Sequence, residues 1–182
     1  MALRFFKRFN ELLVEGDQYK INCHFSGICW DKVTVEEIRY LVDNGANPRF
    51  NNDKPFVMCC RCNSVDVLLL FINEYGANIN GQDGEALTMA VREKNYEAFK
   101  FLIESGITVS DKLIETVFRS NENKFIQIMI EFGVPVERIA KIYWKYLISE
   151  FDFVINKLNL FNKNGLDLNQ SIGKFFAERK IE

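Results

Sequence analysis

The residues most able to bind a metal or to react are five cysteines and a single histidine. Cys23, His24, Cys60 and Cys62 are the set that comes nearest to a zinc ligand shell. Structural zinc needs four ligands that converge on one point. The sulfurs of a Cys-Cys-x-Cys run on one helix point around the cylinder instead, so we expect no metal site and take His24 as a surface or helix-start residue.

Catalytic chemistry has little to build on elsewhere. Besides the lone histidine, the chain contains no GxSxG, no GxxxxGK[ST] and no HExxH motif. Acidic pairs such as Glu36-Glu37 and Glu93/Glu97 fit solvated helix faces. We therefore expect a protein that is not an enzyme, with no catalytic residue and no cofactor.

Composition narrows the classes of partner. The 182 residues are 48% hydrophobic and 26% charged, with a formal net charge of -2. Nucleic-acid binders usually carry a strongly basic face, and membrane helices need about 18 or more consecutive apolar residues. We expect neither partner. An odd number of cysteines without a secretory signal indicates reduced thiols. We therefore expect a cytoplasmic location, which includes the cytoplasm of a host cell.

A repeated pattern organises the chain. Apolar residues at i, i+3, i+6 and i+7 followed by glycine at i+10 occur six times with small variations, the clearest being Tyr96, Phe99, Leu102, Ile103 and Gly106. The glycines fall at 16, 45, 76, 106, 133 and 165, at intervals of 29, 31, 30, 27 and 32 residues. The apolar stripe predicts a helix that ends at a left-handed glycine. A period near thirty indicates a solenoid of helical repeats.

The pattern predicts one array in a single domain. A cap helix in 1–18 is followed by repeats in 19–48, 49–79, 80–108, 109–135 and 136–167, and by a second cap helix in 168–182. The first cap should span about Ala2 to Glu15 and close the stack as a half-repeat. Thr34 should cap a helix that reaches Asn44, and the last helix should begin near Ser171.

The period, the paired short helices and the Gly-Ala-Asn turns at 45–47 and 76–78 resemble ankyrin repeats. The segments 54–59 and 85–90 stand where that family has its Thr-Pro-Leu-His-x-Ala signature. The resemblance implies an all-α solenoid of paired antiparallel helices with short turns between repeats. The irregular style is similar to the divergent ankyrin proteins of large DNA viruses and intracellular bacteria, which implies a host-interaction role.

Alignment of the repeats also explains the cysteines. Cys29, Cys59, Ala90 and Val117 share one position, where a small residue lets neighbouring helices approach. Equivalent positions on adjacent helices lie ~8–10 Å apart, beyond the ~7 Å limit between Cα atoms for a disulfide. We expect no Cys29–Cys59 bridge.

The resemblance implies protein binding through a concave face formed by the inter-repeat turns and the first helix of each repeat. By position, this face comprises Trp30, Arg49, Phe50, Asn52, Asp53, Arg61, Gln82, Asp83, Glu85, Arg92 and Arg119. Phe50 is either tucked under its loop or exposed as an anchor, and burial is the favoured prediction for Trp30.

The expected function is therefore a non-enzymatic adaptor or inhibitor that binds another protein, as a monomer or weak homodimer. The alternative is a structural protein that associates with itself through the aromatic fifth repeat. There, Tyr143, Trp144 and Tyr146 either pack against the cap helix or form a second contact surface.

Overall fold

The computed structural model describes residues 2–28, 33–61, 64–145, 158 and 160–179, and these residues contain helices and no strand. They form two compact units, residues 1–108 and 109–182. The division falls at the boundary predicted between the third and fourth repeats.

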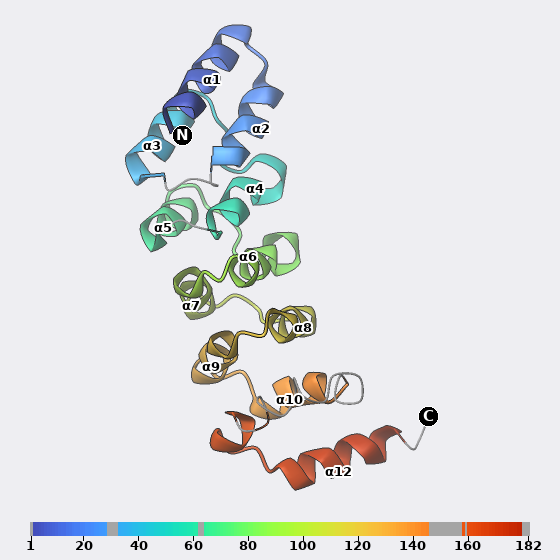
Figure 1. Cartoon of the computed structure of the whole chain (residues 1–182). Helices are drawn as coiled ribbons and strands as arrows, with labels where there is room; N and C mark the ends of the chain where they lie inside the picture. The colour runs from blue at the N-terminus through green and yellow to red at the C-terminus, as the bar shows by residue number, and fades with distance from the viewer. Residues whose placement is uncertain (1, 29–32, 62–63, 146–157, 159, 180–182) are drawn as a thin grey trace. The chain divides into compact units, whose positions relative to one another are not determined.

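The first unit holds seven helices among its described residues (Figure 1): α1 Ala2–Glu15, α2 Gln18–Ile28, α3 Val35–Asp43, α4 Phe50–Cys59, α5 Val65–Asn73, α6 Gly81–Arg92 and α7 Tyr96–Glu104. Helices α2, α4 and α6 pack in sequence along one row, and α3, α5 and α7 pack along the other. We call these the first-helix row and the second-helix row. Each repeat contributes one helix to each row.

The second unit contains α8 Asp111–Ser120, α9 Asn123–Glu131, α10 Val136–Trp144 and α12 Leu168–Arg179. In this unit α10 packs against both α8 and α12. The helix predicted to start near Ser171 begins three residues earlier, because Asp167 caps it by accepting a hydrogen bond from the Gln170 N–H at 3.0 Å.

The helices begin and end with the capping residues and left-handed glycines that the sequence predicts. Thr34 caps α3 with a capping box, in which its hydroxyl oxygen accepts from the Glu37 N–H and Glu37 accepts from the Thr34 N–H. All six glycines of the repeat pattern have positive φ, for example +99° at Gly45 and +84° at Gly106. The α1 boundaries match the prediction, and α2 starts at Gln18, where Asp17 caps it by accepting a hydrogen bond from the Lys20 N–H.

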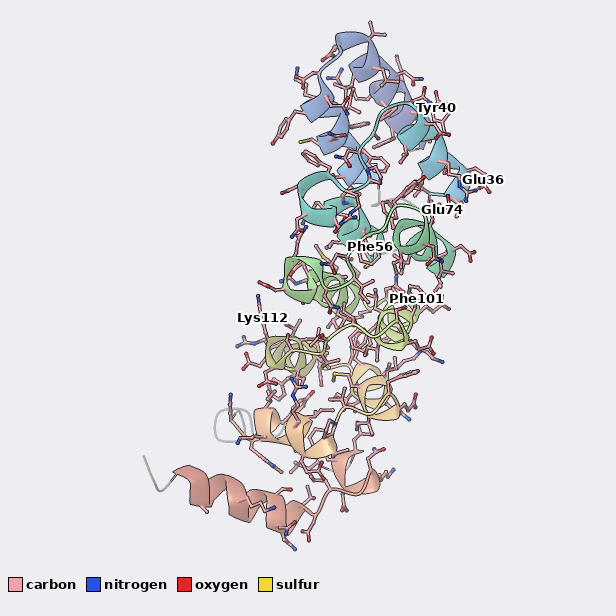
Figure 2. The ribbon with its side chains drawn as sticks, turned by 180° about the vertical axis from the view of Figure 1, so that it is seen from behind. Glu36, Tyr40, Phe56, Glu74, Phe101 and Lys112 are labelled. Atoms are coloured by element: carbon pink, nitrogen blue, oxygen red, sulfur yellow. The ribbon has the colours of Figure 1, made fainter. Side chains whose placement is uncertain are left out.

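The core lies between the two rows and is strongly aromatic. Phe71 on α5 lies 6.4 Å from Phe25 on α2 and 6.3 Å from Phe56 on α4, measured between ring centroids. Phe56 sits between the rows in Figure 2. The small-residue position is buried wherever it is described, with Cys59, Ala90 and Val117 all fully inaccessible. Cys29 and Cys62 lie outside the described residues.

Candidate functional site

The turns between repeats are held by a recurring polar contact. Asn22 on α2 is buried, and its side-chain oxygen accepts a hydrogen bond from the Asn47 N–H at 2.8 Å. Asp53, 31 residues later, is 1% exposed and accepts in the same way from the Asn78 N–H at 3.1 Å. The first two repeats therefore each use a buried side chain to fix the turn at their end.

Asp53 also forms a two-pronged ion pair with Arg49, whose second nitrogen lies 3.1 Å from the Asp53 oxygen. The expectation that Asp53 presents its carboxylate to a partner is therefore wrong: it is buried and accepts three internal hydrogen bonds. The guanidinium of Arg49 remains about half exposed.

In the next repeat the equivalent position is Gly84, which has no side chain to continue the pattern. Asn80 takes over this role, and its side-chain oxygen accepts from the Thr108 N–H at 2.8 Å. The same region contains left-handed backbone, at Asn51, Asn52 and Asp53 and again at Gln82, Asp83 and Gly84. These three-residue turns occupy equivalent places in two repeats, and Asn51, Asn52 and Asp83 among them are exposed.

Other predicted site residues are partly used inside the protein. Gln82 bridges two repeats by donating to the Asn51 and Asn52 carbonyl oxygens at 3.0 and 2.6 Å. Arg92 pairs with Glu85 along α6 at 3.3 Å. Their internal contacts stiffen the turns and leave Asn52, Asp83 and Arg92 exposed at the surface.

Phe50 packs at the surface against an aromatic ring from the preceding repeat. Its ring meets Tyr19 edge to face, with centroids 5.7 Å apart and planes at 75°. Phe50 is partly exposed and Tyr19 is 69% exposed. Sequence reasoning named Phe50 but missed Tyr19, although Tyr19 stands in the first turn of a first helix.

Three predicted residues fall elsewhere. Arg61 lies at the end of α4 and donates to Glu93 at 2.6 Å in a hollow described below. Arg119 is exposed on α8 in the second unit, and Trp30 lies outside the described residues.

Two aromatic residues of the fifth repeat, Tyr143 and Trp144, are interior. Tyr143 is fully buried and meets Phe118 and Phe161 edge to face, at 4.7 and 5.1 Å between centroids. Burial raises the pKa of its hydroxyl. Trp144 is 2% exposed. A contact surface built on these two side chains is therefore wrong, because the core of the second unit already occupies them, and Tyr146 lies outside the described residues.

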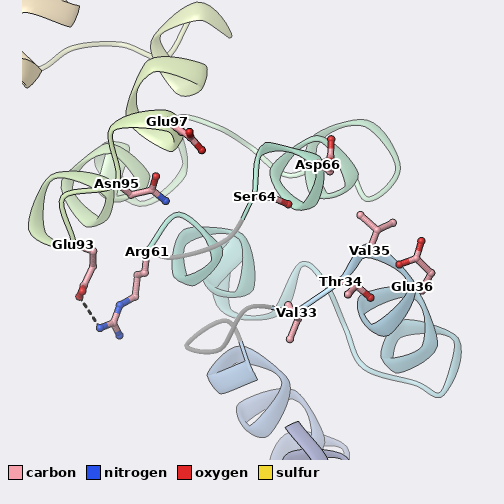
Figure 3. A pocket seen from close by; sticks show the side chains of 10 residues that line it. All are labelled: Val33, Thr34, Val35, Glu36, Arg61, Ser64, Asp66, Glu93, Asn95 and Glu97. Carbon is pink, nitrogen blue, oxygen red and sulfur yellow. Dashed lines mark hydrogen bonds and ion pairs between the residues drawn. The ribbon is translucent and has the colours of Figure 1, made fainter. Parts of the chain in front are cut away.

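The second-helix row carries hollows that the sequence did not predict. The larger measures about 680 Å³ and lies where α3, α5 and α7 begin (Figure 3). Its lining carries four carboxylates, Glu36, Asp66, Glu93 and Glu97, and one cation, Arg61. The signal available in the sequence was an acidic first turn in α3, α5 and α7, which also has a simple role in helix stability.

Metal chemistry and membrane insertion find no support in the described part of the chain. Among these residues no three His, Cys, Asp or Glu side chains are grouped so as to hold a metal ion. None of the helices described has the length and apolar content that crossing a bilayer requires.

Comparison with known proteins agrees with the repeat pattern. Residues 29–112 match the family model for ankyrin repeats (3 copies). Over 113 residues the chain is 23% identical to a putative ankyrin repeat protein, R598, of Acanthamoeba polyphaga mimivirus. This stretch covers 62% of the chain but only 36% of that relative. No solved structure matches the chain.

Proposed function

We propose that the chain is a protein-binding module whose partner contacts the first-helix row of the first unit, because residues 29–112 match the family model for ankyrin repeats and the described residues form an all-α repeat fold. Repeats of this family generally mediate contacts between proteins. The observation that carries the choice of face is the exposed pair of Tyr19 and Phe50.

This pair has the properties of an interface anchor. Aromatic side chains supply large contact areas at low entropic cost and are enriched among the residues that dominate binding energy. Tyr19 keeps most of its surface in contact with water although a phenyl ring lies beside it. A partner that covers both rings buries apolar area contributed by two successive repeats.

The surroundings suit a polar rim around this anchor. Asn52, Asp83 and Arg92 are exposed on the same row. The turns beneath them are fixed by Asp53, Arg49 and Gln82, so little backbone freedom is lost on binding. The predicted residues in these turns thus divide into a group engaged in internal contacts, Asp53, Arg49 and Gln82, and an exposed group that is available to a partner.

The proposed role is non-enzymatic, as an adaptor or an inhibitor. The similarity to a giant-virus protein favours a role in the cytoplasm of an infected cell. A host protein is accordingly the partner class to search for.

Affinity capture from a eukaryotic host-cell lysate, followed by mass spectrometry, tests this proposal. The test variant is Tyr19→Ser with Phe50→Ser, and the matched control is Phe132→Ser, an exposed aromatic residue at the end of α9 in the second unit. We expect at least one protein captured by the wild type and the control to be lost from the test variant. Equal capture by the wild type, the control and the test variant would show that Tyr19 and Phe50 do not anchor the partner.

A further inference from the structure

An apolar surface residue on α5 departs from the repeat pattern. Leu69 stands at the position that carries Arg39 on α3 and Lys100 on α7, both exposed to solvent. Leu69 itself is 37% exposed. The outer side of the second-helix row therefore presents a leucine where its two neighbouring repeats present a cation.

Leu69 lies in a groove between α3 and α5. The groove encloses about 170 Å³ and is lined by the apolar Val35, Leu69 and Leu70 together with Arg39, Asp66, Asn73 and Glu74. Pockets for drug-sized ligands usually measure about 300–1,000 Å³. The volume suits a single inserted side chain better than a small molecule.

The groove continues into the larger hollow, since Val35 and Asp66 line both. Together the two linings carry five carboxylates and two guanidinium groups, a formal charge of -3, against -2 for the whole chain. Glu74 is paired with Arg39 and Glu93 with Arg61. Among the described residues Glu36, Asp66 and Glu97 have no ion-pair partner within 4.0 Å.

Helix stability explains part of this charge. Carboxylates in a first turn interact favourably with the helix dipole, and hydrogen bonding, first of all to its own backbone N–H, lowers the pKa of Glu36. Thr34 and Asn95, however, already cap α3 and α7 with their side chains. The dipole also gives no reason for Leu69 to be exposed. Figure 2 shows Glu36, Tyr40 and Glu74 along the second-helix row.

We propose that this groove is a second docking surface, which binds a basic amphipathic helix of a partner protein. One apolar side chain of that helix enters the groove beside Leu69 and Val35. Lysine or arginine side chains on its flanks meet Glu36, Asp66 and Glu97. Amphipathic helices commonly bind in grooves with this division between apolar anchor and charged flank.

Fluorescence anisotropy on the full chain tests the proposal with a labelled helical peptide made of leucine and lysine, the leucines forming one stripe. A scrambled peptide of the same composition keeps the charge but loses the stripe. The key variant is Leu69→Lys, which introduces the kind of residue found at this position in both neighbouring repeats and should leave folding intact. Asp66→Asn with Glu97→Gln is the second variant, and Glu131→Gln on α9, outside both proposed surfaces, is the matched acidic control.

We expect saturable binding of the striped peptide, at least tenfold weaker binding to Leu69→Lys and to the double variant, and unchanged binding to Glu131→Gln. Equal affinity for Leu69→Lys and wild type would overturn the proposal. So would equal affinity for the scrambled peptide, which would indicate diffuse charge attraction alone. Sedimentation that shows a concentration-dependent dimer dispersed by Leu69→Lys would assign the groove to a second copy of the chain instead.

Discussion

Replacement of Asp53 by alanine is expected to destabilise the first unit much more than its position in a turn suggests. The substitution removes the acceptor of the Asn78 N–H and the partner of Arg49. It also places alanine at φ +64°, in the left-handed region. Each of these changes has a separate expected magnitude.

The orphaned N–H is the largest contribution, because an unsatisfied polar group that is partly buried costs about 1–3 kcal/mol. The left-handed conformation costs alanine roughly 1 kcal/mol more than aspartate or asparagine, which tolerate it. The lost ion pair adds at most about 1 kcal/mol, since the Arg49 guanidinium is half exposed and returns to water. The expected total loss is about 2–5 kcal/mol.

Asp53→Asn is the matched control, because asparagine keeps an acceptor oxygen and tolerates positive φ. It should cost about 1 kcal/mol, mainly through the ion pair. Asn22→Ala tests the same contact one repeat earlier, and loss of its acceptor for the Asn47 N–H should cost about 1–2 kcal/mol.

Urea unfolding followed by helical circular dichroism measures these differences, with the slope of the transition compared between variants. The reasoning is refuted if Asp53→Ala and Asp53→Asn lose the same stability. It is also refuted if Asp53→Ala costs less than about 0.5 kcal/mol, which is typical of an ordinary surface substitution.

Three further predictions concern the core and the caps. Phe71→Ala, at a fully buried ring that contacts Phe25 and Phe56, should cost about 3–5 kcal/mol in the same urea assay; a loss below 1 kcal/mol would mean that the core closes around the gap. His24→Ala should loosen α1, because the His24 ring stacks on Phe5 at 3.9 Å and hydrogen-bonds its carbonyl oxygen at 3.0 Å; hydrogen exchange should rise selectively in residues 5–15, and unchanged protection would refute this. Hydrogen bonds from Lys20, first from its backbone N–H and then from its side chain, lower the pKa of Asp17. Ionised Asp17 therefore stabilises the fold above its unfolded pKa of about 3.9. This stability is lost as the pH falls through the lower pKa of the folded state. Asp17→Asn, which keeps the cap, should flatten the acid limb of urea midpoint against pH, and an identical limb would contradict this assignment.

The repeat architecture could be predicted from the sequence because its signals are local. An apolar stripe and a glycine ten residues beyond its start specify a helix and its end within one segment, as at Tyr96 and Gly106. Thr34 is likewise recognisable as a helix cap, because Glu37 follows it three residues later, as in a capping box.

The candidate surfaces were harder to predict, because they depend on contacts between residues about thirty positions apart. Asp53 looks like an exposed turn residue in the sequence, but in the structure it is buried and accepts hydrogen bonds from Arg49 and from the Asn78 N–H, 25 positions later. The Tyr19 and Phe50 pair arises in the same way. Leu69 could have been noticed by aligning it with Arg39 and Lys100, but its groove with Val35 could not.

The most direct test of the central claim is hydrogen exchange on the complex of the chain with its captured partner. The account predicts slowed exchange on binding at the start of α2 and in residues 47–53, around Tyr19 and Phe50. Protection confined to α8, α9 and α10 of the second unit, with residues 18–53 unchanged, would contradict it.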